Sequence, residues 1–387
     1  MLSWKKFKLS DCLTKVERPV EVVLDKHYAQ IGIRSHGKGL FHKESVTGEE
    51  LGNKAVYWVE PDCFVLNIVF AWEQAIGKTT SSEAGMIASH RFPMYRPKDN
   101  LVDIDYLIAF FLTKRGKDIL EAASPGGAGR NRTLGQERFL NSVITLPPIA
   151  EQRKIAEVLS AQDRVIELKT KLLEEKKLLK KYLCQVLLSG SRRLPIFSDK
   201  WEKKHMSDFL TESRLRGSNG RDAKKLTVKL WGKGVTEKKE HRTGSENTTY
   251  YRRSKGQFIY SKLDFLNGAF GIIPDELDNY ESTIDLPAFD VHGINAEFLL
   301  SYVTDAAFYK KVGVIANGGR KAKRISPTDF LSLSINCPSL REQKSIVEAF
   351  KFVNKEIVVY EKSMEQEKLK KKSLMQHLLT GKIRVKV

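Results

Sequence analysis

The chain has 387 residues, 41% of them hydrophobic, which is enough for two globular domains that each bury a core. Its formal net charge of +19 indicates a polyanionic partner, with nucleic acid ahead of an anionic membrane surface. No apolar run approaches the roughly eighteen residues of a membrane span, and the N-terminus lacks the apolar core and cleavage pattern of a signal peptide, so we expect no membrane association.

The four cysteines, Cys12, Cys63, Cys184 and Cys337, lie far apart and form no C-x-x-C pair. This spacing argues against a zinc knuckle and against a disulfide framework, so we expect a reducing, cytoplasmic environment. The eight histidines are scattered, and His36 and His42 make poor candidates for metal ligands. We therefore expect neither a metal ion nor a cofactor.

The first 148 residues predict a sheet-rich domain. Short β-prone runs such as "KAVYWVEPDCFVLNIVFAW" alternate with glycine and polar turns, which favours a twisted and mostly antiparallel sheet. A helix is predicted from Asp103 to Leu120, opened by a capping-type residue. A glycine-rich basic loop and a short strand ending in proline should follow it.

Residues 149–190 predict one long helix. Steps of four and three residues from Ile155 trace a heptad seam, with charged residues outside it, as in a coiled coil. The helix opens just after "PPIAEQ" and stops at Gly190. The seam residues are Ile155, Leu159, Gln162, Ile166, Lys169, Leu173, Lys176, Lys180, Leu183 and Leu187.

The second half of the chain repeats the first. "WKKFKLSDCL" at Trp4 aligns with "WEKKHMSDFL" at Trp201, 197 residues later, and "LPPIAEQ" aligns with "CPSLREQ" at an offset of 191. From there the match continues without a gap until "LLSG" meets "LLTG". The second seam is Ile346, Phe350, Val353, Ile357, Tyr360, Met364, Glu367, Lys371, Leu374 and Leu378. The offset between the two copies thus changes only slowly along the chain, from 197 to 191. This slow change indicates a tandem duplication of a domain plus a long helix.

The predicted fold is therefore α+β, with two homologous β-rich domains joined by two long antiparallel helices that pair as a coiled coil. An antiparallel pair returns the C-terminus to the first domain and gives a dumbbell with a pseudo-twofold axis. The expected boundaries are 1–148 and 191–339 for the domains, 149–190 for the first spacer helix, and 340–387 for the second helix with its tail. A helix of about 39 residues would reach about 58 Å, too long to pack on one domain.

Two basic loops recur in both halves and are the candidate DNA contacts. Each long-helix segment carries a net charge of only +3, so most of the positive charge lies on the domains and tails. Glycine permits a close backbone approach, and lysine or arginine beside it can contact phosphate. Solvated turns are the competing interpretation for any single residue. The candidates in the "RSHGKG" and "KLWGKG" loops are Arg34, Ser35, His36, Lys38, Lys229, Trp231 and Lys233, and those in the later loops are Arg130, Arg132, Arg320, Lys321, Lys323 and Arg324.

The two copies differ where base readout would require it. Ser35-His36 in the first copy becomes Leu230-Trp231 in the second, and residues 236–255 resemble nothing in the first half. If both domains touch DNA, the shared basic residues would position the phosphates while the divergent side chains read different bases.

The duplicated "P-P/S-[IL]-x-E-Q" helix starts, the "L-L-[ST]-G" ends, the basic loop before each proline-terminated strand and the Trp-starting domains resemble the specificity subunit of type I restriction-modification enzymes. The resemblance covers nearly the whole chain. It implies two target-recognition domains that each read half of a bipartite sequence in double-stranded DNA, with the paired helices as a ruler. It also implies binding to two methyltransferase subunits and, in a full enzyme, to restriction subunits.

The sequence carries no amino-methyltransferase signature, no glycine-rich cofactor turn and no P-D followed by E-x-K. We therefore expect a subunit without chemistry of its own. Two alternatives remain at this point: an enzyme fused to a dimerising coil, and a non-catalytic coiled-coil scaffold that binds nucleic acid by charge alone.

Overall fold

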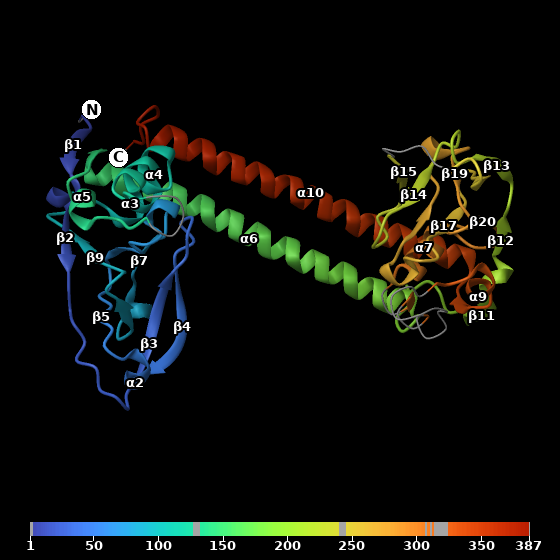
Figure 1. Ribbon diagram of the computed structural model, residues 1–387, viewed down its shortest axis with the longest axis horizontal. Helices are drawn as coiled ribbons and strands as arrows, with labels where there is room; N and C mark the ends of the chain where they lie inside the picture. Colours follow the sequence, from blue (N-terminus) through green and yellow to red (C-terminus); the bar gives the residue numbers. More distant parts are fainter. Residues whose placement is uncertain are drawn as a thin grey trace. The chain divides into compact units, whose positions relative to one another are not determined.

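The computed structural model describes residues 3–126, 132–239, 245–305, 308–309, 312 and 324–386. These residues form two compact units, in which the halves of each long helix belong to different units. The first unit comprises Met1–Thr170 together with Lys362–Val387, and the second comprises Lys171–Glu361 (Figure 1). The first unit therefore contains both the beginning and the end of the chain.

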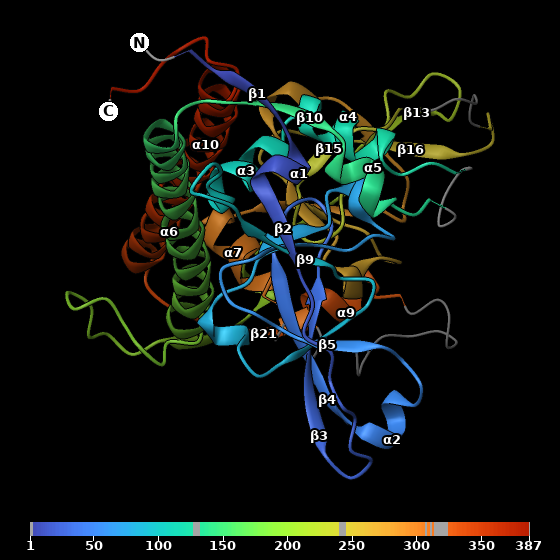
Figure 2. The same ribbon diagram turned by 90° about the vertical axis from the view of Figure 1, so that its left-hand side faces the viewer.

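Two four-stranded sheets build the first unit, in the orders β2-β9-β6-β7 and β4-β3-β8-β5. A separate pair joins β1 near the N-terminus to β10 just before the first long helix. All these pairings are antiparallel except the contact between β3 and β8, which confirms a mostly antiparallel sheet. The strands are β1 Lys5–Lys8, β2 Leu13–Val16, β3 His27–Ile33, β4 Leu40–Thr47, β5 Val56–Trp58, β6 Phe64–Leu66, β7 Ile76–Lys78, β8 Ile87–Ser89, β9 Met94–Pro97 and β10 Val143–Leu146. Figure 2 shows the long β3–β4 hairpin beside α2 (Gly48–Leu51).

The core of the first unit is rich in aromatic side chains. Phe64, Phe111 and Phe139 come from three different elements, and their ring centroids lie 5.6 to 6.2 Å apart. All three rings are fully buried. Packing of such large apolar rings contributes a major share of the hydrophobic free energy of a small domain.

The helix predicted from Asp103 to Leu120 is instead two helices, α3 (Ile104–Phe111) and α4 (Lys114–Ala122). Asp103 does cap the first one, because its carboxylate accepts a hydrogen bond from the Tyr106 amide. The break follows from Thr113, whose extended backbone and side chain cap α4 through the amide of Gly116. A Cβ at Gly116 would lie 2.2 Å from the Phe110 carbonyl oxygen, so the close approach of the two helices requires glycine there. The first unit also contains α1 (Leu9–Cys12) and α5 (Gln136–Leu140).

The second unit repeats most of this internal topology, but where the first unit has the sheet β4-β3-β8-β5 the second has the sheet β13-β16-β19 and a separate pair, β14-β15. The sheet β12-β20-β17-β18 has the connectivity of β2-β9-β6-β7, and β11 pairs with β21 as β1 pairs with β10. Asn295 caps α7 (Ala296–Val303) through the Phe298 amide, as Asp103 caps α3. A short helix, α9 (Pro327–Leu331), precedes the last strand, as α5 does in the first unit. The strands are β11 Glu202–His205, β12 Leu210–Ser213, β13 Arg216–Asn219, β14 Leu226–Val228, β15 Val235–Glu237, β16 Thr249–Arg252, β17 Phe258–Tyr260, β18 Phe270–Ile272, β19 Glu281–Ser282, β20 Ala288–Val291 and β21 Ser334–Cys337.

The described part of residues 236–255 has a structural counterpart in the first half although its sequence has none. β16 pairs with β19 as β5 pairs with β8. On its other edge the amide of Arg252 donates to the Leu215 carbonyl, as the amide of Trp58 donates to the Arg18 carbonyl. The topology of the repeat thus persists where the side chains have diverged.

The two long helices are α6 (Ile149–Leu188) and α10 (Leu340–Leu378), coloured green and red in Figure 1. All twenty predicted seam residues lie in the described chain, and each is buried or half-buried. The apolar members pack between the helices and against the sheets, where Leu159 and Leu378 join the core of the first unit and Leu187 and Ile346 that of the second. The heptad pattern therefore identified the buried face of both helices.

The polar seam residues find partners on the opposite helix. In the first unit Lys169 donates to the Glu367 carboxylate at 2.8 Å and to the Ser363 hydroxyl at 2.7 Å, and Gln162 donates to Glu367 at 2.8 Å. In the second unit Lys176 donates to Glu356 at 2.9 Å. These contacts run between antiparallel helices, so the lysines that interrupt the apolar seam support pairing. Lys180 is half-buried and has no ion pair with another described residue.

The Glu-Gln pair in the first turn of each long helix fastens that helix to a domain. The buried side chain of Gln152 accepts from the Asp103 amide at 3.0 Å and donates to the carbonyls of Leu101 and Pro147, both at 2.9 Å. Gln343 makes the equivalent contacts with the Asn295 amide and the Pro338 carbonyl, both at 2.8 Å. Each glutamine thus ties the helix start to the cap of a domain helix.

The preceding glutamate binds an arginine that follows the end of the other long helix. Glu151 pairs with Arg384, beyond the end of α10, and Glu342 pairs with Arg193, beyond the end of α6. Both carboxylates are almost fully buried. The C-terminal tail is in this way part of the first unit, as the antiparallel arrangement predicts. Within the described ranges, neither long helix nor any shorter one is apolar enough over a sufficient length to cross a membrane.

Candidate nucleic-acid interface

The loop between β3 and β4 is fixed by backbone hydrogen bonds. The Arg34 amide donates to the Gly39 carbonyl at 3.0 Å and closes the loop. The amides of His36 and Gly37 donate to the carbonyls of Glu73 and Gln74 at 2.8 and 2.9 Å, next to a 3₁₀ turn at Ala71–Glu73. The loop is therefore held in one position although its tip is exposed.

The loop between β14 and β15 has the same construction. The Lys229 amide donates to the Gly234 carbonyl at 2.8 Å. The amides of Trp231 and Gly232 donate to the carbonyls of Asn267 and Gly268 at 2.9 and 2.8 Å, next to the 3₁₀ turn Phe265–Asn267. The two loops therefore share one backbone structure.

The third residue of each loop has a left-handed backbone, with φ of 60° at His36 and 61° at Trp231. Residues other than glycine, asparagine and aspartate rarely adopt this conformation. The glycines that follow, Gly37 and Gly232, also have positive φ, and a Cβ at Gly37 would lie 2.3 Å from the Leu112 side chain. Both loops thus sit closely against the end of a domain helix.

Four basic side chains of these loops face solvent. Lys38, Lys229 and Lys233 are exposed and have no ion pair with another described residue. Arg34 is exposed too, and its guanidinium lies 4.8 Å above the Phe41 ring, a cation–π distance. Exposed cations on a rigid loop can bind phosphate without first giving up an internal partner.

The tips of the two loops carry different chemistry. Ser35 is half-buried and donates to the Glu73 carboxylate at 2.9 Å, while His36 is exposed. In the second unit the corresponding residues are apolar and exposed: Leu230 by 39% and Trp231 by 61%. One tip therefore offers hydrogen-bonding groups, and the other offers an apolar surface.

The second pair of basic loops is only partly described. Arg130, Arg320, Lys321 and Lys323 lie outside the described residues. Arg132 is half-buried, with its guanidinium 5.6 Å above the Trp72 ring, so it lies beside the 3₁₀ turn that holds the Arg34–Gly39 loop. In the second unit Arg324 lies 3.6 Å from the Asp285 carboxylate, with both side chains about half exposed. The structure brings the two predicted loops of the first unit together at Trp72.

The sequence did not single out the 3₁₀ turns that hold the loops. Their sequences, "AWEQ" and "FLNG", share nothing that would mark them as equivalent. A better signal was the glycine in "AIGK" and "AFGI": a Cβ at Gly77 or Gly271 would lie within 2.4 or 2.6 Å of the first side chain after the loop. The arginines at 193 and 384 were also missed, although they continue the alignment at the offset of 191.

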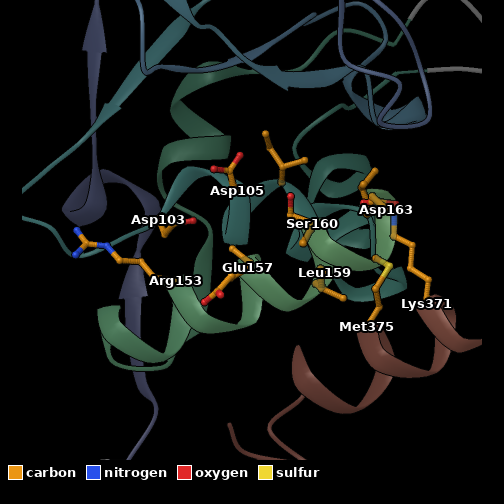
Figure 3. A pocket seen from close by; sticks show the side chains of 13 residues that line it. Asp103, Asp105, Arg153, Glu157, Leu159, Ser160, Asp163, Lys371 and Met375 are labelled. Atoms are coloured by element: carbon orange, nitrogen blue, oxygen red, sulfur yellow. Dashed lines mark hydrogen bonds and ion pairs between the residues drawn. The ribbon is translucent and has the colours of Figure 1, made fainter. Parts of the chain in front are cut away.

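A pocket of about 440 Å³ in the first unit is a poor site for nucleic acid. It lies between α3 and the two long helices (Figure 3) and is lined by four carboxylates, Asp103, Asp105, Glu157 and Asp163, against two basic residues, Arg153 and Lys371. An excess of negative charge repels phosphate. The polyanion surface is therefore better sought at the basic loops.

The described ranges contain no arrangement of three or more His, Cys, Asp or Glu side chains suited to a metal ion. His42 is engaged in a 3.0 Å contact with Glu83. The four cysteines are free thiols, and burial raises the pKa of Cys12 and of Cys337 to about 11. Neither thiol is therefore disposed to act as a nucleophile near neutral pH.

Comparisons with known proteins agree with this structure. A family model described as "Type I restriction modification DNA specificity domain" matches residues 46–177. The type I restriction enzyme MjaVIII specificity subunit of Methanocaldococcus jannaschii is 24% identical over 400 residues, covering 94% of this chain and 86% of that protein. The MjaX specificity subunit of the same organism is 25% identical over 343 residues, covering 81% of this chain and 77% of that protein.

The fold has counterparts among solved structures. The HsdS subunit from Thermoanaerobacter tengcongensis matches with a TM-score of 0.63 at 16% identity, covering 98% of this chain and 97% of that chain. The type I restriction-modification S subunit from M. genitalium matches with a TM-score of 0.52 at 12% identity, covering 97% of this chain and 96% of that one. Taken with the duplicated domains and the paired helices, these comparisons show that the chain is similar over nearly its whole length to type I restriction-modification specificity subunits.

Proposed function

We propose that this chain reads a bipartite, asymmetric sequence in double-stranded DNA, with one part of the sequence read by each unit. The observation that carries the proposal is the similarity of the loops Arg34–Gly39 and Lys229–Gly234. Their backbone hydrogen bonds are the same and their flanking residues are basic, whereas the side chains at their tips differ. Shared basic residues would position the phosphates, and the different tips would read different bases. The contacts we assign to DNA are Arg34, Ser35, His36, Lys38, Arg130, Arg132, Lys229, Trp231, Lys233, Arg320, Lys321, Lys323 and Arg324.

We assign target recognition to residues 1–148 and 191–339, and the gap between the two DNA parts to the paired helices. A helix of 40 residues is about 60 Å long at 1.5 Å per residue. That length corresponds to about 1.7 turns of DNA, in which one turn is about 34–36 Å. The tail after α10 would attach to the first unit through the ion pair of Arg384 with Glu151.

We infer that catalysis comes from partners: two methyltransferase subunits and, where the system cleaves DNA, restriction subunits. One chain of similar fold comes from work on complex assembly and conformational transition of the type I restriction-modification system. Both long helices display apolar side chains on their solvent faces, which would suit docking of a methyltransferase. They are Leu168, Leu178, Leu179 and Tyr182 on α6, and Phe352, Val358, Val359 and Leu369 on α10. Work on chromosomal DNA would take place in the cytoplasm, where free thiols persist.

Domain exchange followed by methylation mapping tests this proposal. Residues 1–148 are replaced by the corresponding domain of another specificity subunit, and the chain is expressed with its own methyltransferase in a host without methylation. Genome-wide methylation should then reveal a motif with one altered and one unchanged half. An alteration of both halves, or no two-part motif with the unaltered chain, would contradict the proposal.

The alternative function is a scaffold that binds nucleic acid through charge alone. The net charge of +19 is compatible with it. Charge-driven binding follows salt concentration but not base sequence. A purified chain that binds the mapped motif no more tightly than scrambled duplexes of equal length would favour the scaffold.

A further inference from the structure

The Leu230-Trp231 tip is an apolar projection flanked by two lysines. The chain has five tryptophans, all in described positions, and Trp231 is the exposed one, at 61%. Its backbone is held at the amide by the Asn267 carbonyl and lies over Gly268, where an added Cβ would come 3.4 Å from the Trp231 Cα. A large apolar surface kept in water by a rigid loop typically marks a contact with a partner.

The backbone conformation strengthens this argument. Trp231 has φ of 61°, a conformation that strongly disfavours large side chains, and a glycine there would relieve it. The Trp231 side chain is exposed rather than packed in the core, so core packing does not account for its retention. The flanking Lys229 and Lys233 are also exposed, and they leave the tip between two phosphate-binding groups.

We propose that Trp231 contacts the bases of the half-site read by the second unit through apolar packing, whereas the first unit reads its half-site through the hydrogen-bonding groups of Ser35 and His36. This proposal deepens the proposed function and rests on it. Two apolar surfaces of DNA fit the indole: the 5-methyl group of thymine in the major groove, and the face of a base exposed by partial unstacking. In either case the lysines would supply affinity without base preference.

The structure supplies a conservative variant for the test, Trp231→His. His36 occupies the equivalent backbone position with φ of 60°, so histidine is compatible with the loop. The matched control is Ile196→His, which removes another exposed apolar side chain, 73% accessible, from the same unit. Circular dichroism and thermal unfolding should be unchanged in both variants, since neither side chain is buried.

The measurement uses the full chain in complex with its methyltransferase and a duplex that carries the motif read from genomic methylation. Trp231→His should weaken specific binding by about 10- to 100-fold, the cost of one or two mismatched base pairs, and remove discrimination at those pairs. The salt dependence should not change, because Lys229 and Lys233 remain. Ile196→His should bind like the wild type.

Two modified duplexes distinguish the apolar surfaces. Uracil in place of thymine should reproduce the loss if the indole packs on the methyl group. If the indole packs on an unstacked base, the fluorescence of 2-aminopurine placed in the duplex should increase when the wild type binds but not when Trp231→His binds. Unchanged affinity and base preference in Trp231→His would overturn the inference while leaving the proposed function intact. Failure of the wild type to prefer its mapped motif would instead overturn the proposed function.

Discussion

The ammonium group of Lys169 on α6 lies 2.8 Å from the carboxylate of Glu367 on α10, within the seam between the two helices. Glu367 also accepts from Gln162, one heptad earlier on α6. At the repeat offset of 191, Glu367 aligns with Lys176, so a second copy of α6 in place of α10 would bring lysine to lysine. The two halves of the duplication have diverged into complementary charge along their seam.

Replacing Glu367 by lysine should therefore lower the thermal stability of the chain. The substitution removes the acceptor of Gln162 and Lys169 and puts two ammonium groups together, which repel each other. Glu361→Lys is the control, because Glu361 makes the same 2.8 Å contact with Lys177 between the same helices, but both side chains are about half exposed. Differential scanning calorimetry should show a larger fall for Glu367→Lys. Equal effects would contradict a special role for the seam pair.

The sequence predicted the buried face of both helices because a heptad pattern needs only local spacing. It also predicted the cap at Asp103, since a short polar side chain before an apolar run acts locally. It did not predict the partners of Lys169 and Lys176, which depend on residues about 200 positions away. The break at Thr113 was missed because the close approach at Gly116 arises from tertiary packing. The loop positions were predicted from repetition, but the turns that hold them were not.

Replacing Gln152 by leucine should destabilise the junction between α6 and the first domain. The side chain is fully buried and makes three hydrogen bonds, so leucine would leave one backbone amide and two carbonyls without the hydrogen bonds that Gln152 makes. Each unsatisfied buried group costs about 1–3 kcal/mol, and we expect a loss within or somewhat above that range in the free energy of unfolding. Urea denaturation measures it. Gln185→Leu, an exposed position on the same helix, should change stability by less than about 0.5 kcal/mol.

Acid should weaken the first unit through Glu83. Burial opposes ionisation of this carboxyl, but hydrogen bonds from Ser82, His42 and Thr80 outweigh it and lower its pKa to about 2. A depressed pKa stabilises the folded state above the unfolded pKa of about 4.5, and this contribution is lost as the pH falls from about 4.5 toward 2. The stability lost between pH 6 and pH 3 should therefore be smaller in Glu83→Gln than in the wild type. Parallel pH profiles of the two proteins would contradict this assignment.

Replacing Phe352 by aspartate should weaken binding to the methyltransferase without unfolding the chain. The side chain is 65% exposed on α10, so its loss costs little core packing, whereas a buried aromatic anchor at an interface is worth about 2 kcal/mol or more. Titration calorimetry with the methyltransferase of the same system measures the effect. Lys344→Asp changes an exposed residue of the same helix and should have a weaker effect. Equal affinity of Phe352→Asp and the wild type would exclude this face as the docking surface.

Replacing Lys38 by alanine should weaken binding to every DNA sequence by a similar factor. Lys38 is exposed on the Arg34–Gly39 loop and has no ion pair with another described residue, so its ammonium group is available to a phosphate. Loss of one phosphate contact lowers the slope of log K against log salt by about 0.9 and leaves base preference unchanged, because a phosphate carries no sequence information. Binding isotherms for the mapped motif and a scrambled duplex at several salt concentrations measure both quantities. Lys54→Ala, an exposed lysine beyond the other end of β4, is the control and should keep the wild-type slope. A selective loss for the mapped motif would instead show that Lys38 reads a base.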